Sequence, residues 1–272
     1  MKKYKIFLHL VLVSFIILLG DDMKAVITGA SSGLGKEFAY LLSDMGYDLI
    51  LVARRKTRLE ALKKELKTNV EIKIYDLAST FNCVKLYEEI KNEDIDILIN
   101  NAGFGLVGDF TKTKLDKEMD MIDLNIKAVH TLTKLFLTDM KKKDKGYILN
   151  VASSASFMPG PLMATYYATK SYVYNLTMAI TEELRRNNSN VYISCLCPGP
   201  VDTEFNKVAK VEFGVSSLSS DYVSKYALKH MFKGKKIIVP GFKIKLVHLL
   251  SKIVPLKILL PSVYNIQREK IK

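Results

Sequence analysis

The chain has 272 residues, a formal net charge of +13 and an apolar fraction of 49%, which suits one sizeable α/β domain with a packed core. Its three cysteines, Cys83, Cys195 and Cys197, are too few and too irregularly spaced for a disulfide framework or a zinc site, so we expect a reducing compartment and no metal. The lysines are scattered along helical segments without an aromatic-basic motif, which indicates a solvated basic surface and argues against nucleic-acid binding.

The first 22 residues differ from the rest of the chain. Lysines precede an apolar run from Ile6 to Leu19, which is short for a membrane span and lacks an Ala-x-Ala-like cleavage site. Two interpretations stay open. Residues 1–22 form a signal peptide or short membrane anchor, or the native chain starts at Met23, directly before the first strand pattern. We expect a cytoplasmic protein, with membrane association through residues 1–20 as the alternative.

From Lys24 onward, short β-branched runs alternate with longer amphipathic stretches, as in βαβ units on a parallel sheet. Seven segments are predicted as strands: Lys24–Thr28, Asp48–Ala53, Glu71–Tyr75, Ile95–Asn100, Gly146–Val151, Asn190–Cys197 and Lys236–Val239. The helical patterns between them are Gly33–Met45, Lys56–Lys67, Thr80–Lys91, Leu115–Met140 and Tyr166–Arg186. We therefore predict a Rossmann-type, doubly wound, seven-stranded parallel sheet flanked by helices, as a single domain over residues 23–241, followed by a basic and apolar tail over 242–272.

A glycine-rich segment joins the first strand to the first helix. Gly29, Gly33 and Gly35 permit a tight turn, close approach of the backbone to a pyrophosphate, and close packing of helix on strand. The helix N-terminus around Leu34 then offers free N–H groups and a positive dipole end. This segment predicts a site for the phosphates of a dinucleotide.

The end of the second strand predicts which dinucleotide binds. A carboxylate there would bind the ribose hydroxyls of NAD, but this chain has Arg54 and Arg55 instead. A guanidinium fork suits the 2′-phosphate of NADP. We expect Arg54 to be the main contact, assisted by Arg55 and by the hydroxyls of Ser31 and Ser32. NADPH is the predicted cofactor, and NAD is less favoured.

A tyrosine and a lysine lie four residues apart at the start of the helix that follows the fifth strand. Tyr166 and Lys170 share one helix face, so the ammonium is expected to lower the tyrosine pKa toward the working range. Tyr166 would then act as general acid when a carbonyl is reduced and as general base in reverse. Ser153 closes the fifth strand and is expected to hold the substrate oxygen beside Tyr166.

These motifs resemble the short-chain dehydrogenase/reductase superfamily, from Lys24 to about Thr203. The resemblance rests on Thr-Gly-x-x-x-Gly-x-Gly at Thr28–Gly35, Asn-Asn-Ala-Gly at Asn100–Gly103, and the Ser153…Tyr166-x-x-x-Lys170 arrangement. It implies cofactor contacts by further residues: Asp76 and Leu77 at the adenine, Asn101 and Ala102 beside the adenosine half, and Pro198, Gly199, Val201 and Thr203 at the nicotinamide end.

The resemblance also implies the reaction, a hydride transfer between NADP(H) and a small carbonyl or alcohol substrate. Tyr166 exchanges the proton, Ser153 orients the oxygen, Lys170 binds the nicotinamide ribose, and Asn125 holds a water that links Lys170 to solvent. The alternative is a catalytically silent NADPH-binding sensor, although such proteins usually lack the tyrosine or the lysine, and both are present here. We expect a homodimer or homotetramer.

Substrate specificity is expected after the Pro-Gly segment. Residues 204–226 form the predicted substrate lid, with the loop Phe157–Thr165 as the opposite wall. The apolar lid residues suggest a moderately apolar substrate: Phe205, Val208, Val211, Phe213 and Leu218. The tail after Phe242 mixes apolar residues with lysines and is broken by prolines. It could lie on a membrane, cover the site or join a dimer, and we favour packing against the body or a partner subunit.

Overall fold

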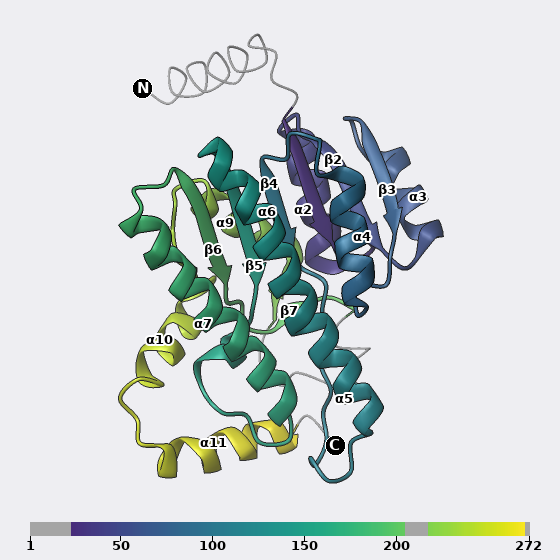
Figure 1. Cartoon of the computed structure of the whole chain (residues 1–272). Helices are drawn as coiled ribbons and strands as arrows, with labels where there is room; N and C mark the ends of the chain where they lie inside the picture. The colour runs from purple at the N-terminus through teal and green to yellow at the C-terminus, as the bar shows by residue number, and fades with distance from the viewer. Residues whose placement is uncertain (1–22, 205–216, 270–272) are drawn as a thin grey trace, which may run out of the picture.

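The computed structural model describes residues 23–204 and 217–269 and has a parallel sheet of seven strands in the order β3-β2-β1-β4-β5-β6-β9 (Figure 1). The strands are β1 Lys24–Thr28, β2 Asp48–Ala53, β3 Val70–Ile74, β4 Ile97–Asn100, β5 Gly146–Val151, β6 Val191–Leu196 and β9 Ile237–Ile238. The strand order reverses between β1 and β4, which places a crevice at the carboxyl ends of these two strands. The predicted doubly wound fold is confirmed.

Helices cover both faces because successive strand residues point to opposite sides. In β1, Ala25 and Ile27 belong to the core beneath α2 Gly33–Asp44, α3 Lys56–Glu65 and α9 Ser220–Met231. Val26 instead joins the core beneath α4 Thr80–Ile90, α6 Val129–Lys143 and α7 Ala164–Arg186. The three consecutive apolar residues of β1, Ala25 to Ile27, are therefore all buried, which explains this apolar run.

The predicted helix Leu115–Met140 has an internal irregularity. It consists of α5 Leu115–Ile122, the π-helical turn η1 Asp123–Ala128, and α6. The extra residue in a π-turn shifts the helix face and often marks a functional position. Three short elements were not predicted, because segments of two to four residues carry no periodic pattern: β7 Val201–Asp202, β8 Leu218–Ser219 and the single turn η2 Ser154–Phe157. The ends of several strands also differ from the prediction by a few residues.

The tail forms two helices that pack against the body, α10 Phe242–Leu250 and α11 Leu256–Arg268. Ile244 of α10 packs beside the core around β6, and the His248 ring lies 4.0 Å from the Phe157 ring, centroid to centroid. Val263 and Gln267 of α11 are buried. Figure 1 shows α11, in yellow, at the end of the molecule toward which the strands run. The tail is thus joined to the wall of the strand-end crevice.

Candidate active site

A cavity of about 610 Å³ opens at the carboxyl ends of the strands, a volume that suits a small-molecule site. Its wall comes from the glycine-rich segment, the ends of β2, β3, β4 and β5, the start of α7 and the segment after β6. The predicted site residues in this wall are Gly29, Ser31, Ser32, Gly33, Leu34, Arg54, Arg55, Asp76, Leu77, Asn101, Ala102, Ser153, Tyr166, Lys170, Pro198, Gly199, Val201 and Thr203. Gly35 and Asn125 lie behind it.

The glycine-rich segment has the backbone geometry that the sequence predicts. Gly29 and Gly33 adopt φ of 67° and 54°, where a side chain would be strained. A Cβ on Gly35 would lie only 2.4 Å from the carbonyl oxygen of Gly29. Gly35 therefore permits close packing of α2 on the loop and makes no direct contribution to the cavity wall.

Asn101 ties this loop to the end of β4. Its Nδ2 donates to the carbonyl oxygens of Thr28, at 3.0 Å, and of Gly29, at 3.3 Å. The Thr28 hydroxyl oxygen in turn accepts from the backbone N–H groups of Asn101 and Ala102, at 2.9 and 3.1 Å. Asn101 and Ala102 thus form a wall beside the loop.

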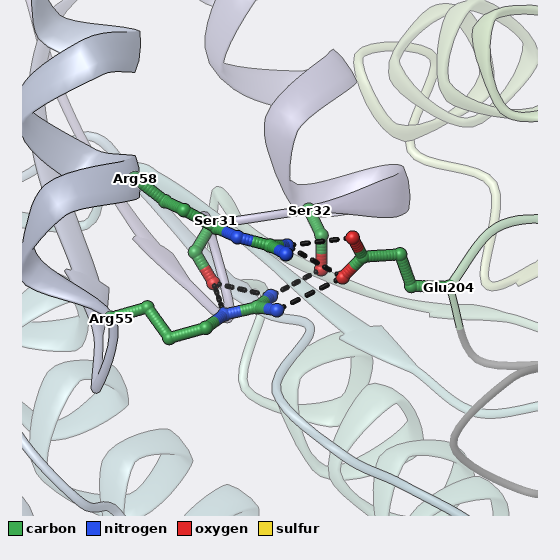
Figure 2. A network of polar contacts seen from close by, with 5 residues as sticks. All are labelled: Ser31, Ser32, Arg55, Arg58 and Glu204. Carbon is green, nitrogen blue, oxygen red and sulfur yellow. Dashed lines mark hydrogen bonds and ion pairs between the residues drawn. The ribbon is translucent and has the colours of Figure 1, made fainter.

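Arg55, Ser31, Ser32 and Glu204 line one end of the cavity, and Arg58 joins their network of polar contacts (Figure 2). Arg55 donates from Nη2 to Ser31 Oγ at 2.9 Å and to Ser32 Oγ at 2.8 Å. Arg55 Nη1 lies 2.9 Å from Glu204 Oε2, and Arg58 Nη1 lies 2.7 Å from both Glu204 oxygens. Arg58 and then Arg55 hold the pKa of the Glu204 carboxyl below its usual value. This end of the cavity already holds one anion.

The two adjacent arginines of the cavity wall have different surroundings, and the main phosphate contact expected of Arg54 stays a prediction. The Arg54 side chain is 70% exposed and turns to Asp76, with Nη1 3.5 Å from Oδ2. Arg55 lies instead against the serines, because it precedes the first residue of α3 and faces the glycine-rich segment. Arg58 was not predicted as part of this site, although its position one helical turn after Arg55 indicates that the two side chains share a helix face.

Ser153, Tyr166 and Lys170 lie together at the other end. Tyr166 is 8% exposed and Lys170 is 5% exposed. Lys170 Nζ donates to the carbonyl oxygen of Val151 at 2.9 Å and lies 5.9 Å from the centroid of the Tyr166 ring. The end of β5 and the first turns of α7 therefore bring the three predicted side chains to one place.

The predicted lowering of the Tyr166 pKa is wrong. Burial raises the pKa of Tyr166 to about 12, and a hydrogen bond with Ser153 opposes that rise only in part. Burial also lowers the pKa of Lys170 to about 8, because charge is costly away from water. Desolvation of the phenolate therefore decides the direction in which the Tyr166 pKa shifts.

Asn125 lies in the π-helical turn, fully buried behind the cavity wall. Its Nδ2 donates to the Phe104 carbonyl oxygen at 2.9 Å and to Thr169 Oγ1 at 3.1 Å, while its Oδ1 accepts from the Phe104 N–H at 3.1 Å. A Cβ on Gly103 would lie 2.8 Å from Asn125 Oδ1 and 3.4 Å from Lys170 Nζ. The bare Gly103 thus separates the amide from the ammonium.

Few of the residues predicted for the substrate lid and the opposite wall are found in the described part of the cavity wall. Phe205, Val208, Val211 and Phe213 lie outside the described residues. Leu218 belongs to β8 and packs against the core instead of lining the cavity. From the Phe157–Thr165 loop, only Met163 reaches the cavity wall.

Tyr167 and Gln267 line the cavity as well, and neither was predicted. Gln267 comes from the tail, where one amide in an amphipathic helix gives no sequence signal. Within residues 23–204 and 217–269, no group of three or more His, Cys, Asp or Glu side chains could hold a metal, and no helix is long and apolar enough to cross a membrane.

Two sequence comparisons point to one family. The family model for short chain dehydrogenases matches residues 23–212. An uncharacterized oxidoreductase of Staphylococcus saprophyticus is 39% identical over 186 residues, covering 67% of this chain and 76% of the relative. A very-long-chain 3-oxoacyl-CoA reductase of Pyrenophora tritici-repentis is 35% identical over 199 residues, covering 68% of this chain. This chain spans only 57% of that reductase's length.

Solved structures share the fold. A short-chain dehydrogenase from Sphingobium yanoikuyae in complex with NADPH gives a TM-score of 0.77 at 27% identity, covering 86% of this chain and 96% of that one. A short-chain dehydrogenase/reductase from Burkholderia phymatum in complex with NAD gives 0.78 at 23% identity, with coverage of 85% and 92%. The similar folds thus include both NADPH-bound and NAD-bound proteins.

Proposed function

The chain belongs to the short-chain dehydrogenase family of nicotinamide-dependent oxidoreductases, and we propose that it is an NADP(H)-dependent enzyme that interconverts a carbonyl and an alcohol. The observation that carries the proposal is the layout of one cavity. A cluster of guanidinium and hydroxyl groups lies at one end, and a buried Ser–Tyr–Lys set lies at the other.

The phosphate end fits NADP. Arg55 and Arg58 bind the carboxylate of Glu204, which acts as a stand-in anion, and the hydroxyls of Ser31 and Ser32 accept hydrogen bonds from Arg55 beside it (Figure 2). The same donors suit the 2′-phosphate, because a guanidinium fork binds phosphate oxygens much as it binds carboxylate oxygens. We therefore assign the main phosphate contact to Arg55, with Arg58 and the serines assisting. Arg54, paired with Asp76, takes a secondary position beside the adenine.

The catalytic end fits carbonyl reduction. NADPH, when bound, supplies the hydride for the carbonyl carbon. Because the pKa of Tyr166 is raised to about 12 by burial, its phenol is protonated at neutral pH and is ready to donate a proton to the carbonyl oxygen. Ser153, hydrogen-bonded to Tyr166, orients that oxygen.

Lys170 and Asn125 support Tyr166. With a pKa lowered to about 8, Lys170 is mostly protonated at neutral pH yet gives up its proton more readily than an exposed lysine. It is therefore suited both to hold the nicotinamide ribose and to return a proton toward Tyr166. Asn125 acts as a positioning residue, because its amide braces Phe104 and the Thr169 turn of α7 next to Lys170.

The substrate class to test first is a 3-oxoacyl ester or thioester. Very-long-chain 3-oxoacyl-CoA reductases are among the relatives that cover two thirds of this chain. The substrate end of the cavity is mixed in character, with Phe104 and Met163 beside the hydroxyl of Tyr167. Such a wall suits an acyl chain that carries polar oxygens.

The test is oxidation of NADPH and of NADH across a panel of 3-oxo esters, simple ketones and aldehydes. We expect turnover with NADPH and a much lower kcat/KM with NADH. Tight NADPH binding without turnover on any carbonyl would support the silent sensor instead, which the complete Ser153, Tyr166 and Lys170 set does not favour. Equal use of NADH would contradict the phosphate assignment.

A further inference from the structure

Gln267 carries the tail into the cavity. It is 1% exposed, although it lies on a helix whose next residues, Ile266 and Arg268, are exposed. Its Nε2 donates to the hydroxyl oxygen of Tyr167, 100 residues earlier in the chain. Among the described residues, its Oε1 has no hydrogen-bond partner.

A buried amide whose oxygen has no hydrogen-bond partner is unfavourable unless another group supplies that hydrogen bond. Exchanging the amide oxygen and nitrogen does not solve the problem, because the Tyr167 hydroxyl can satisfy only one of them in either orientation. The amide lines the cavity, so the group that completes it can come from a ligand.

Tyr167 is held in place from two sides. A Cβ on Gly160 would lie 2.3 Å from the Tyr167 ring, so the ring rests directly on the bare backbone of Gly160. The Tyr167 and Tyr166 rings are 6.2 Å apart, centroid to centroid, at an interplanar angle of 77°. Burial raises the pKa of Tyr167 to about 12, so its hydroxyl stays neutral and can both donate and accept. A fixed neutral hydroxyl thus lies next to the proposed proton donor.

We propose that Tyr167 and Gln267 form a polar subsite for a second carbonyl or hydroxyl group of the substrate, close to the carbonyl that is reduced. The subsite rests on the proposed function, because it binds a substrate whose reacting oxygen is at Ser153 and Tyr166. Helix α11 therefore helps to select substrates with two oxygens a few bonds apart, such as 3-oxo esters and thioesters. A simple ketone leaves the amide half-paired.

The experiment compares two substrates in one enzyme preparation: a 3-oxo ester and a ketone of matched chain length without the ester carbonyl. We expect Gln267→Leu to lower kcat/KM for the 3-oxo ester by about 10-fold, the value of one lost hydrogen bond, and to leave the ketone within about 2-fold. The matched control is Asn265→Leu, an exposed amide on the same helix, which should change neither value.

The ratio of kcat/KM for the two substrates does not depend on how much of a variant is folded. Tyr167→Phe and Gly160→Ala should reproduce the selective loss, the first by removing the hydroxyl and the second by displacing the ring. An equal fall on both substrates, or none, would overturn the subsite. If the wild-type enzyme reduces neither substrate with NADPH, the proposed function itself fails, which is a different result.

A second observation concerns the outer side of the tail. Of the 20 exposed large apolar side chains in residues 23–204 and 217–269, ten lie between residues 242 and 266, among them Phe242, Leu249, Ile253 and Leu256. Exposed lysines lie between them at positions 243, 245, 252 and 257, and no carboxylate occurs from residue 242 to residue 268. This apolar and basic surface is called the tail patch below.

We infer that the tail patch docks on the surface of an anionic lipid bilayer. Apolar side chains suit the acyl boundary, and lysines suit the anionic headgroups. A second copy of the chain is a poorer occupant, because a twofold interface would place this patch against itself and bring lysines together without a carboxylate between them. The α11 helix would then bring the cavity wall that holds Gln267 close to the membrane.

The test is co-sedimentation of the full chain with phosphatidylcholine vesicles, with and without phosphatidylglycerol. We expect binding that depends on phosphatidylglycerol, lost in Leu249→Ser/Ile253→Ser and in Lys252→Glu/Lys257→Glu, and unchanged in the control Phe81→Ser on α4. All variants keep residues 1–22, so that segment is common to every comparison. Binding that ignores the tail substitutions would overturn the inference, as would a dimer that these substitutions convert to a monomer.

Discussion

The two ends of the cavity are built in different ways. At the cofactor end, serine hydroxyls of the glycine-rich segment meet charged side chains from the start of α3 and from Glu204, and the Arg55 side chain is still 43% exposed. At the substrate end, Lys170, Tyr166 and Gln267 are almost fully buried. Recognition at the first end depends on charge, whereas at the second it depends on placement and on the cost of burying polar groups.

The largest effect is expected at the buried end, from Tyr166→Phe. Removing the hydroxyl removes the proton donor, so kcat should fall by about 10²- to 10⁴-fold. NADPH binding, followed by the change in its fluorescence, should stay within about 2-fold, because no charge at the phosphate end has changed. Unchanged turnover would show that another group supplies the proton.

Lys170→Met tests what the buried charge costs. Burial lowers the pKa of Lys170 from 10.5 to about 8, so the unfolded chain binds more protons between these values, and wild-type stability rises with pH across that window. The wild-type enzyme should gain about 3 kcal/mol in free energy of unfolding relative to the variant between pH 8 and pH 10.5. Urea unfolding of both proteins at several pH values measures this difference. A difference that is independent of pH would contradict the lowered pKa.

At the charged end, Arg55→Ala should raise the KM for NADPH by about 10- to 100-fold, the effect of losing a charged hydrogen bond. The KM for NADH should change little, because NADH lacks the 2′-phosphate. Arg54→Ala is the matched control with a smaller expected effect, since that side chain pairs with Asp76. A larger effect from Arg54→Ala would make Arg54 the main phosphate contact, as the sequence predicts.

The smallest effect is expected from Glu204→Gln. The Glu204 carboxylate occupies the same donors as the proposed phosphate, so removing its charge should tighten NADPH binding. Because the side chains of Arg55, Arg58 and Glu204 are each at least 40% exposed, NADPH binding should tighten by only about 2- to 5-fold. Calorimetry with NADPH and with NADH would measure it. Weaker NADPH binding would mean that Glu204 supports the arginines and does not compete with the cofactor.

Much of the cofactor end was predictable because each motif there is local. The glycine spacing and the strand-to-helix order both lie within a few consecutive residues. Which of two adjacent arginines faces the serines was not predictable, because it depends on the direction in which α3 leaves β2. The π-helical turn at Asn125 also escaped prediction, since a single extra residue barely changes the apolar period of a helix.

The sequence alone determined the fold class, the strands and the position of Ser153, Tyr166 and Lys170 at strand and helix ends, because apolar periodicity and glycine spacing act over short distances. Only the tertiary structure decided the contents of the substrate end. Gln267 meets Tyr167 across 100 residues of chain, a contact without a local signature. The pKa of Tyr166 likewise depends on the packing of the whole cavity wall, and burial reversed the direction that the neighbouring lysine alone would predict.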